Sequence, residues 1–375
     1  MSVKLKAYKL GSIIEPVRIR CGESNPEVVG VDINHSFIPT RANLSGVDTT
    51  KYQVVPERCF ACNLMHIGRD ERIPLAYNDT GRNLVITPAY YVFRVKKDME
   101  ALVIPYYLYL YLCRQETDRY TWFCTDSSIR GNLPESRLLD IEIPIPDIEI
   151  QQQLVDVWEG LNGLKVETDA QAEPLMGLCM SYLKKLRDEY DSVPLGQKIE
   201  SCEGRNKEGL LTIENVRGIS IAKSFIFSKA NMEGVPLGGY KIVRPNEFAF
   251  VTVTSRNGEK ISLAYNDSQD LDYLVSATYE VFRVNTDDLL PEYLYLWFLR
   301  PEFDRYARFH SWGSARETFN LEDMKRVCIP IPDKAIQQAI VDIYKCAKES
   351  KAISTEAENL RKAVAPALIQ KAIHY

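Results

Sequence analysis

Two stretches of the chain, 1–148 and 192–334, share a pattern of short runs in which apolar and polar residues alternate. These runs are rich in β-branched and aromatic residues and are broken by Gly, Pro and Asn-Asp turns, so they predict strands with short helices. Tyrosine and leucine alternate from Tyr107 onward, and again from Tyr293, too densely for one exposed face. We therefore expect buried helices at these two places inside mixed α/β domains.

The segments that follow, 149–191 and 335–375, have a helical period and no strand pattern. The proline before Asp147 or Asp333 keeps the entry extended, and the aspartate can then cap a helix. A helix of about 40 residues runs roughly 60 Å at ~1.5 Å per residue, which is more than a small domain needs to cover its core. The pattern therefore predicts two long spacer helices.

A heptad stripe runs along both predicted helices, apolar at seven of ten positions in the first and six of ten in the second. The first stripe passes through Leu154, Val157, Leu161, Leu164, Thr168, Gln171, Leu175, Leu178, Tyr182 and Lys185. The second passes through Ile340, Ile343, Ala347, Ser350, Ser354, Ala357, Arg361, Val364, Leu368 and Lys371. Both helices carry the stripe in the same register, as a coiled-coil pair requires.

The charges of the two helices differ in sign. Residues 151–191 hold four basic and eight acidic side chains, a charge of −4, whereas 334–375 hold seven basic and four acidic, a charge of +3. Opposite signs favour packing of the two helices on each other within the chain over pairing of each helix with its own copy in another molecule. Two independent amphipathic helices, each on its own domain, remain the alternative.

The second half of the chain restates the first at an offset of 185 to 189 residues. The collinear matches include Leu75–Asp79 with Leu263–Asp267, Val92–Val95 with Val281–Val284, Tyr107–Leu110 with Tyr293–Leu296, Asp118–Tyr120 with Asp304–Tyr306, Ile143–Asp147 with Ile329–Asp333, and Ile150–Gln152 with Ile336–Gln338. These matches indicate a duplicated module. We expect an α+β protein in which two repeated mixed α/β domains are separated by two long antiparallel coiled-coil helices, with internal pseudo-twofold symmetry.

Length and composition set the class of protein. With 375 residues, 45% of them hydrophobic, the chain is long enough for two or three cores. Apolar stretches such as 103–111 are short and interrupted, so none spans a bilayer, and the first residues lack the apolar core of a signal peptide. We expect a cytoplasmic protein with no membrane partner.

Cysteine usage indicates reduced thiols. The nine cysteines are an odd number and follow no framework spacing, as in proteins of a reducing compartment. Cys59 and Cys62 form a CxxC pair, but a structural zinc needs a second pair or histidines at ligand spacing. The repeat places Glu247 and Phe250 at the equivalent positions, so we expect strand-core cysteines and no metal site.

The overall charge limits how the chain could bind nucleic acid. A formal charge of −5 argues against a surface that grips DNA everywhere, because phosphate contacts need Lys and Arg, although local basic faces remain compatible with it. Two similar domains on a rigid spacer suit duplex DNA, whose equivalent groove faces lie about 34 to 36 Å apart. We expect the chain to contact bases at local sites, while a partner protein makes many of the contacts to the DNA phosphate backbone.

In its order of domain, helix, domain and helix, the chain resembles the specificity subunit of type I restriction-modification systems over nearly its whole length. The resemblance rests on the Ile-Pro-Ile-Pro-Asp turn into Ile-Gln-Gln, and on the Tyr-Leu-Tyr helix with Asp-Arg-Tyr before it. It implies target-recognition domains at 1–148 and 192–334 and conserved spacer helices at 149–191 and 335–375. One departure is glutamine at Gln151 and Gln337, where a Glu-Gln pair is common in the family.

The resemblance also implies a bipartite, asymmetric target in double-stranded DNA. Each domain would read one half, and the length of the helices would set the unread gap between them. The helices would dock two copies of an adenine methyltransferase subunit that carries S-adenosylmethionine, and a restriction subunit is a further candidate partner. This chain itself would bind no cofactor.

Catalytic motifs are missing from the sequence. An amino-methyltransferase needs an Asn-Pro-Pro-aromatic type of motif, and Asn25-Pro26-Glu27 lacks the second proline and the aromatic. No phosphate-cradling Gly-x4-Gly-Lys-Ser/Thr occurs. Pro146-Asp147 and Pro332-Asp333 resemble the opening of a nuclease motif, but no Glu-x-Lys follows at a suitable distance. We expect a non-catalytic recognition subunit.

Base reading needs Arg, Lys, Asn, Gln or Ser on exposed loops, and the loop before the last strand of each domain is the first candidate. It supplies Ser127, Ser128, Arg130 and Asn132 in the first domain and Ser311, Trp312, Ser314 and Arg316 in the second. Ser128 aligns with Ser314 and Arg130 with Arg316, so these residues could hold phosphates common to both half-sites. The residues of this set that have no counterpart in the other repeat would then distinguish the bases of each half-site.

Two further sets of polar residues are candidates for DNA contacts. The loops beside the two Leu-Ala-Tyr-Asn-Asp motifs supply Arg69, Arg72, Arg82, Arg256, Asn257 and Lys260, on turn sequences that present polar tips. A third set comprises Arg41, Asn43, Lys223 and Asn231. For every candidate, a solvated surface charge is the alternative.

Two other functions remain open at this point. The acidic charge would suit a two-domain scaffold that joins proteins and never touches DNA. The other is a subunit, or a fused nuclease or methyltransferase, of a related restriction type.

Overall fold

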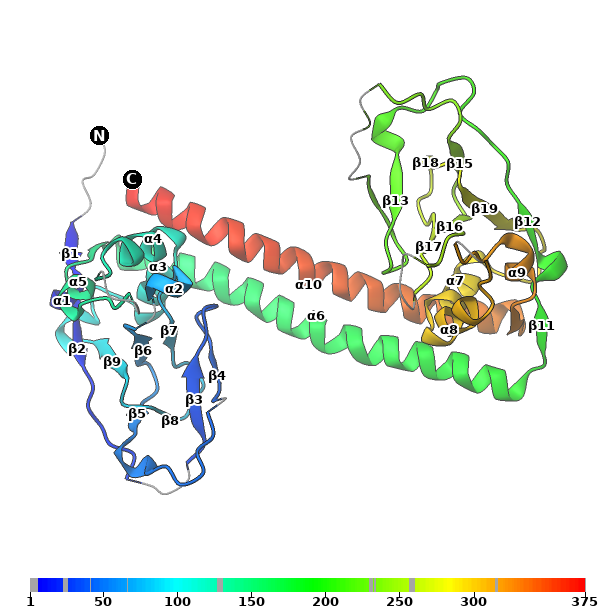
Figure 1. Ribbon diagram of the computed structural model, residues 1–375. Coiled ribbons are helices and arrows are strands. Elements are labelled where there is room, and N and C mark those ends of the chain that lie inside the picture. Colours follow the sequence, from blue (N-terminus) through cyan, green and yellow to red (C-terminus); the bar gives the residue numbers. More distant parts are fainter. Residues whose placement is uncertain are drawn as a thin grey trace. The chain divides into compact units, whose positions relative to one another are not determined.

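The computed structural model describes residues 6–22, 26–40, 42–65, 67–126, 131–228, 232, 234–255, 260–313 and 316–374. The chain divides into two compact units, one formed by Met1–Glu167 with Ile353–Tyr375 and the other by Thr168–Ala352. Each unit holds one globular domain together with parts of two long helices, α6 (Ile148–Glu189) and α10 (Lys334–His374) (Figure 1).

The first domain is built on two four-stranded sheets. One has the order β2-β9-β6-β7 and the other β4-β3-β8-β5, in which β3 and β8 are parallel and all other neighbours antiparallel. The strands are β2 (Ile14–Pro16), β3 (Val28–Val31), β4 (Phe37–Pro39), β5 (Gln53–Val55), β6 (Phe60–Asn63), β7 (Leu75–Tyr77), β8 (Leu84–Ile86) and β9 (Tyr90–Val95), and β1 (Ala7–Lys9) pairs with β10 (Glu142–Pro144). The helices are α1 (Leu10–Ile13), α2 (Ile67–Asp70), α3 (Pro105–Leu112), α4 (Gln115–Phe123) and α5 (Glu135–Leu139).

The second domain repeats this plan with one four-stranded sheet of the order β12-β19-β16-β17 and three strand pairs, β13-β14, β15-β18 and β11-β20. The strands are β11 (Ser192–Pro194), β12 (Ile199–Ser201), β13 (Arg217–Ile219), β14 (Phe225–Phe227), β15 (Lys241–Val243), β16 (Glu247–Val251), β17 (Leu263–Tyr265), β18 (Tyr273–Val275), β19 (Tyr279–Val284) and β20 (Cys328–Pro330). The helices are α7 (Pro291–Leu299), α8 (Pro301–Phe309) and α9 (Leu321–Lys325). The expectation of mixed α and β structure is confirmed in both domains.

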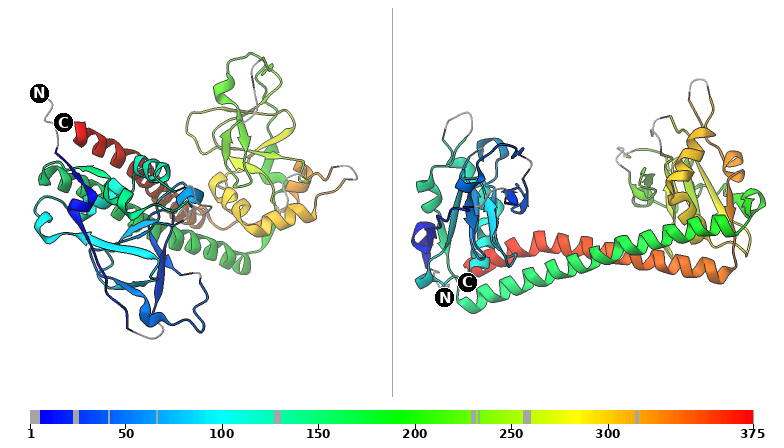
Figure 2. Two further views of the ribbon diagram at one scale, coloured as in Figure 1. Left: turned by 60° about the vertical axis from the view of Figure 1, so that its left-hand side comes forward. Right: turned by 90° about the horizontal axis from the view of Figure 1, so that it is seen from below.

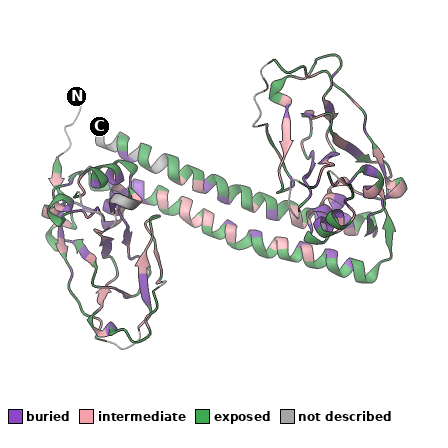
Figure 3. Cartoon of the chain, viewed as in Figure 1, coloured by how far each residue is buried: buried purple, intermediate pink, exposed green. Residues whose placement is uncertain are grey.

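Each core is centred on a cross-strand pair of phenylalanines. Phe60 on β6 lies opposite Phe93 on β9 with their rings stacked 4.8 Å apart, and Phe248 lies opposite Phe282 at 4.9 Å. Aromatic pairs in this arrangement stabilise neighbouring strands. The faces of the sheets that carry these pairs are buried, whereas loops are exposed (Figure 3).

The tyrosine-rich helices lie inside the domains, as the sequence predicts. Tyr107 on α3 and Tyr293 on α7 have no exposed surface, and their hydroxyls donate to the carbonyls of Pro144 and Pro330 at 2.9 Å in both cases. Pro144 and Pro330 belong to the Ile-Pro-Ile-Pro-Asp motifs. The motif is therefore held against its own domain by a buried hydrogen bond before the long helix begins.

A buried glutamine fixes the first turn of each long helix. Gln151 accepts from the amide of Ile104 at 2.9 Å and donates to the carbonyls of Leu102 and Pro146 at 2.7 Å each. Gln337 makes the equivalent three bonds, to the amide of Leu290 and the carbonyls of Asp288 and Pro332. A glutamate could not donate to the two carbonyls, so the amide is what this site requires.

Within each unit the two long helices lie beside each other and run in opposite directions. In the first unit Arg361 donates to Asn162 at 3.0 Å, and Ile369 packs in a cluster with Leu154 and Val155. In the second unit Lys351 contacts Asp169 at 2.9 Å and Cys179 contacts the carbonyl of Ile340 at 3.9 Å. The last turns of α10 therefore lie against the first domain (Figure 2).

The stripe predicted for α10 is buried or half-buried wherever its side chains are described. The stripe predicted for α6 is right at alternate positions only, where Leu154 and Thr168 are buried and Leu161 and Leu175 are half-buried. Val157, Leu164, Leu178 and Tyr182 are exposed, and Trp158, Lys165, Cys179 and Leu183 point inward instead. Both of these faces of α6 contain apolar residues, so periodicity alone does not predict which one is buried. The second domain decides which face is buried, because Cys179, Leu183 and Leu186 complete its core.

Cys62 lies within β6 and Cys59 directly precedes it, and both thiols are free and buried. Burial raises the pKa of the Cys59 thiol to about 11, and that of Cys62 further still. The expectation of strand-core cysteines is confirmed.

Candidate nucleic-acid interface

The asparagine of each Leu-Ala-Tyr-Asn-Asp motif shapes the loop that follows it. The Asn78 amide donates to the carbonyls of Val55 and Arg82 at 2.9 and 2.8 Å and accepts from Thr80. Asn266 repeats these contacts with Val243, Leu271 and Ser268. Both asparagines are fully buried, so they are structural residues that position the loop tips.

The loop tips beside these asparagines carry the second set of candidate residues. Arg72 and Arg82 are exposed, and Arg82 contacts Glu27 at 3.4 Å across the surface. Lys260 is also exposed. Arg69 lies in α2 with its side chain outside the described residues, and Arg256 and Asn257 lie outside them altogether.

The structure brings the first and second sets together within each domain. In the first domain the amide of Leu133, next to Asn132, donates to Leu64 just before α2 at 2.8 Å. In the second, Thr254 and Phe319 exchange backbone bonds with the opposite loop, through Glu317 at 3.0 Å and Thr252 at 2.9 Å. In each domain, backbone hydrogen bonds thus join the segments that flank the two predicted loops.

The first set itself divides into exposed and buried members. Trp312 is 67% exposed and Arg316 is exposed, whereas Asn132 is half-buried and its backbone N–H donates to the carboxylate of Asp126 at 3.0 Å. Ser311 is a correction, because it is buried and its hydroxyl donates to Ala307 at 2.7 Å, closing the end of α8. Ser127, Ser128, Arg130 and Ser314 lie outside the described residues.

The third set contains a second correction. Lys223 is only 4% exposed, and its ammonium donates to the carboxylate of Asp304, so it cannot act as a surface contact for DNA. Asn43 is exposed and accepts from the amide of Ser45 at 3.0 Å, which leaves its amide nitrogen outward. Arg41 and Asn231 lie outside the described residues.

The equivalent of Lys223 in the first domain is His35. Both residues have a positive φ, 64° for His35 and 62° for Lys223, and the carbonyl of each accepts from a tyrosine of the buried helix, Tyr109 or Tyr295. His35 faces Asp118 at 4.0 Å, and Asp118 accepts from the amide of Ile73 at 3.1 Å. The conserved position therefore carries a weaker pair in the first domain.

Burial shifts the titration of these groups. It lowers the pKa of His35 and of Lys223, and raises the pKa of Asp118 to about 6. The positive charge of the Arg72 guanidinium lowers the pKa of Asp118 and so partly offsets the effect of burial. Arg72 therefore lies near this pair, which connects a predicted loop to the buried frame beneath it.

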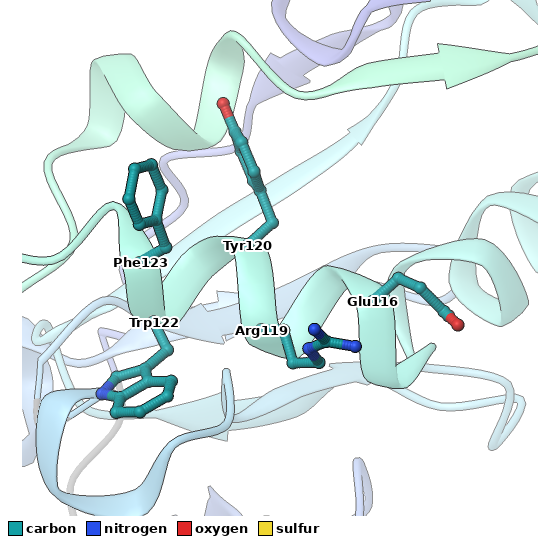
Figure 4. Close-up of a pocket in the computed structure, with 5 residues that line it drawn as sticks. All are labelled: Glu116, Arg119, Tyr120, Trp122 and Phe123. Atoms are coloured by element: carbon teal, nitrogen blue, oxygen red, sulfur yellow. The ribbon is translucent and has the colours of Figure 1, made fainter.

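An aromatic surface lies at the end of α4, where Glu116, Arg119, Tyr120, Trp122 and Phe123 line a shallow hollow (Figure 4). The rings of Tyr120 and Phe123 project from one side of the helix and that of Trp122 from the other. Phe123 is 83% exposed, and its repeat partner Phe309 on α8 is 72% exposed. A large apolar residue kept exposed in both repeats suits a contact that both domains make.

One charged surface was not selected from the sequence. Arg18, Arg20 and Lys51 line a groove in the first domain. The available signal was two arginines at alternate positions of an extended segment, and their spacing was too short to stand out in an acidic chain.

Within the described residues, no cluster of three or more His, Cys, Asp or Glu is arranged to hold a metal ion. In the same part of the chain, no helix has the length and apolar character needed to cross a membrane.

Comparison with known proteins adds a family match. A model of the type I restriction modification DNA specificity domain matches residues 241–359, from β15 into α10. The specificity subunit of the type I restriction enzyme HindI from Haemophilus influenzae is 24% identical over 144 residues, which cover 38% of this chain and 30% of that protein. The aligned part is thus less than a third of the relative's length.

Solved structures extend the comparison to the whole fold. The type I restriction-modification S subunit from M. genitalium superposes with a TM-score of 0.61 at 13% identity, covering 98% of this chain and 95% of that one. The HsdS subunit from Thermoanaerobacter tengcongensis covers 99% of this chain and 97% of its own at 16% identity, with a TM-score of 0.40. Residues 241–359 therefore match the type I restriction modification DNA specificity domain, and the chain as a whole has the fold of the M. genitalium S subunit.

Proposed function

We propose that this chain reads a bipartite, asymmetric target in duplex DNA, with one target-recognition domain for each half-site. One observation carries the proposal: the repeats keep the same buried frame and differ in the loop tips above it. Asn78 and Asn266 hold equivalent loops, but the tips they position are unlike in sequence. Domains with one frame and unlike tips suit two unlike half-sites, because polar groups on loops distinguish base edges.

The exposed tips are the proposed DNA contacts. They are Arg72, Arg82 and Asn43 in the first domain and Lys260, Trp312 and Arg316 in the second, and the half-buried Asn132 is a further proposed contact. The candidates outside the described residues remain proposals of the same kind. The domain boundaries at 148, 191 and 334 are proposals as well.

We propose that α6 and α10 pair along their length as an antiparallel coiled coil and act as the ruler between the half-sites. The opposite charges of the two helices support this pairing, as do the contacts of Arg361 with Asn162 and of Lys351 with Asp169. Insertion of one heptad into each helix should lengthen the unread gap and leave both half-sites unchanged. A change in the recognised bases would show that the helices are not the ruler.

The partners proposed for the helices are two adenine methyltransferase subunits, which carry the S-adenosylmethionine that this chain does not bind, and restriction subunits where the host has them. Apolar side chains left exposed on the helices support docking there. Val157 and Leu164 are a heptad apart on α6, and Ile353 and Leu360 a heptad apart on α10. This spacing places each pair on one helix face, available to a partner.

Mapping N6-methyladenine in host DNA, with and without this gene, tests the proposed function in its cytoplasmic setting. We expect one two-part motif with a fixed gap to lose its methylation when the gene is removed. An unchanged methylation map, together with no selective binding of duplex DNA by the chain and its methyltransferase partner, would instead support a scaffold that never touches DNA.

Exchange of one domain tests the division of labour. Residues 192–333 would be replaced by the corresponding domain of a relative with a different target. We expect only one half of the methylated site to change. A change in both halves would refute reading by separate domains.

A further inference from the structure

A groove opens in the first domain where the chain leaves β2 and passes between two sheets. The amide of Val17 donates to Val92 of β9 at 2.8 Å, and the carbonyl of Ile19 accepts from Val54 of β5 at 2.8 Å. The amide of Cys21 then donates to Tyr52 at 2.8 Å. Residues of this extended segment, of β9 and of β5 line the groove.

The groove has a volume of about 420 Å³ and a lining that carries only positive charge. Its residues are Pro16, Val17, Arg18, Ile19, Arg20, Lys51, Gln53, Pro88, Tyr90, Tyr91 and Val92. Arg18 and Arg20 share a face because they alternate along an extended segment. Both are exposed and form no ion pair with any described residue, while Lys51 makes an exposed contact with Asp48 at 3.5 Å.

The second domain shows that the fold does not require this charge. The same backbone bonds recur there, from Cys202 to Val281, from Ile242 to Gly204 and from Asn206 to Tyr240. These bonds place Glu203 where the first domain has Arg18, Gly239 where it has Lys51, and Lys241 where it has Gln53.

The charges at these equivalent positions are compensated. Lys241 is only 5% exposed and contacts Glu280 at 3.2 Å and Glu203 at 3.7 Å. Arg205, which matches Arg20, donates to the carbonyl of Gly239 at 2.8 Å. The second domain therefore uses this place for internal ion pairs. Among the described residues, the first domain instead leaves Arg18 and Arg20 without an ion pair and Lys51 with one exposed contact, to Asp48.

We propose that this groove binds the phosphodiester backbone of duplex DNA beside the half-site read by the first domain, and that the second domain makes no equivalent contact. The inference rests on the proposed function. Guanidinium groups match phosphate oxygens in geometry and charge. The amide nitrogen of Gln53 is already held by the carbonyl of Tyr90 at 2.8 Å, so the groove offers cations rather than a free amide for reading bases.

Salt dependence of DNA binding tests the proposal. The chain would be produced with its methyltransferase partner as wild type, as the groove variant R18A/R20A/K51A, and as the control K9A/K97A/R137A. The control removes the same charge from exposed positions of the first domain outside the groove. Affinity for a duplex that carries the mapped site would be measured over a range of salt concentrations, and thermal unfolding would confirm that both variants fold.

Each lost phosphate contact lowers the slope of log affinity against log salt by about 0.9, so the groove variant should lose about 2 to 3. The control should keep the wild-type slope, and the half-site sequences should stay the same for all three proteins. Equal slopes for the groove variant and the control would overturn the inference alone. Failure of the wild-type complex to bind any duplex would overturn the proposed function with it.

Phosphate ethylation gives a second reading of the same groove. Phosphates whose ethylation blocks binding of the wild type, but no longer affects the groove variant, should lie beside the half-site that changes when the first domain is exchanged. If they lie beside the other half-site, the assignment to the first domain is wrong.

Discussion

The ammonium of Lys223 donates to the carboxylate of Asp304 in the interior of the second domain, and the ion pair is almost closed to solvent. The matching pair of the first domain, His35 and Asp118, is 4.0 Å apart. In both domains the aspartate also accepts from the backbone, from Ile73 or Ile261. The repeats therefore share an acceptor and differ in the cation that faces it.

We expect loss of the two aspartates to have unequal effects. D304N would leave a buried ammonium without its counterion, and breaking a buried pair in this way costs about 3 to 5 kcal/mol. D118N would leave a histidine that is neutral near pH 7, and its amide oxygen could still accept from Ile73, so a cost of about 1 kcal/mol is expected. Chemical denaturation at pH 7, with hydrogen exchange to separate the two domains, measures both.

The double variant K223M/D304N provides the control. If the cost of D304N comes from the unpaired ammonium, removing the ammonium should restore much of the stability. Equal costs for D304N and D118N would contradict the difference between the two pairs.

The stability of the first domain should depend on pH through the protonation of Asp118. Its folded pKa of about 6 lies above the ordinary aspartate value of 3.8, so the folded state binds this proton more tightly and its stability is greatest with the proton bound. The contribution is present at low pH and is lost as pH rises from 4 to 6, by at most about 3 kcal/mol. His35, whose pKa is lowered, acts oppositely, because acid must charge it in the interior.

The measurement is the stability of the first domain from pH 4 to pH 7, in the wild type and in D118N. The advantage of the wild type over D118N should shrink as pH rises through this window. An advantage that grows with pH would mean that Asp118 is stabilised as the carboxylate.

Because the buried Gln151 anchors α6 to the first domain, its substitution by glutamate should strongly lower the stability of the first unit. Q151E would place a carboxylate against the carbonyls of Leu102 and Pro146, to which the amide now donates, so both carbonyls would lose a buried donor. A loss of about 2 to 4 kcal/mol in the stability of the first unit is expected. Q152E is the matched control, because Gln152 is exposed and its amide donates to Asp156 on the same exposed face rather than to buried carbonyls. Similar stabilities for the two variants would show that Gln151 is not an anchor.

Much of the fold could be predicted from the sequence because the duplication provides an internal alignment. Residues that recur and are apolar, such as Tyr107 with Tyr293, proved to be core residues. The recurring Gln151 and Gln337 proved to be buried anchors, although the sequence indicated only a local role at the start of a helix. Recurrence of a residue in both repeats therefore predicts that the residue is buried more reliably than it predicts which groups that residue contacts.

The candidate site was less predictable, because the side chain of a polar loop residue can point to solvent or into the domain. Lys223 and Ser311 were chosen as surface contacts, yet tertiary packing buries the first against Asp304 and the second against α8. The stripe predicted for α6 is wrong at every other position for a related reason. The globular domain selects which of two apolar rows is buried, and this contact is distant in sequence.

Within the second domain, Trp312 and Arg316 should contribute differently to DNA binding. Arg316 matches an arginine of the first domain, so R316A should weaken binding to all sequences alike, as loss of a phosphate contact does. Trp312 has no matching tryptophan, so W312A should change the preference among bases in one half-site by about 1 to 3 kcal/mol. Methylation rates on duplexes that vary one half-site at a time would distinguish them. Uniform weakening by W312A would remove it from base reading.

The end of α10 should stabilise the first domain, although the second domain precedes it in sequence. Ile369 is almost fully buried in a cluster with Tyr107, Leu110, Leu154 and Val155. I369A should therefore cost about 2 to 4 kcal/mol, and hydrogen exchange should rise in α3 and the start of α6 while β16 and β19 keep their protection. L360A is the matched control, because Leu360 is exposed on the same helix and should cost far less. Equal protection of α3 in I369A and wild type would mean that the first domain does not depend on α10.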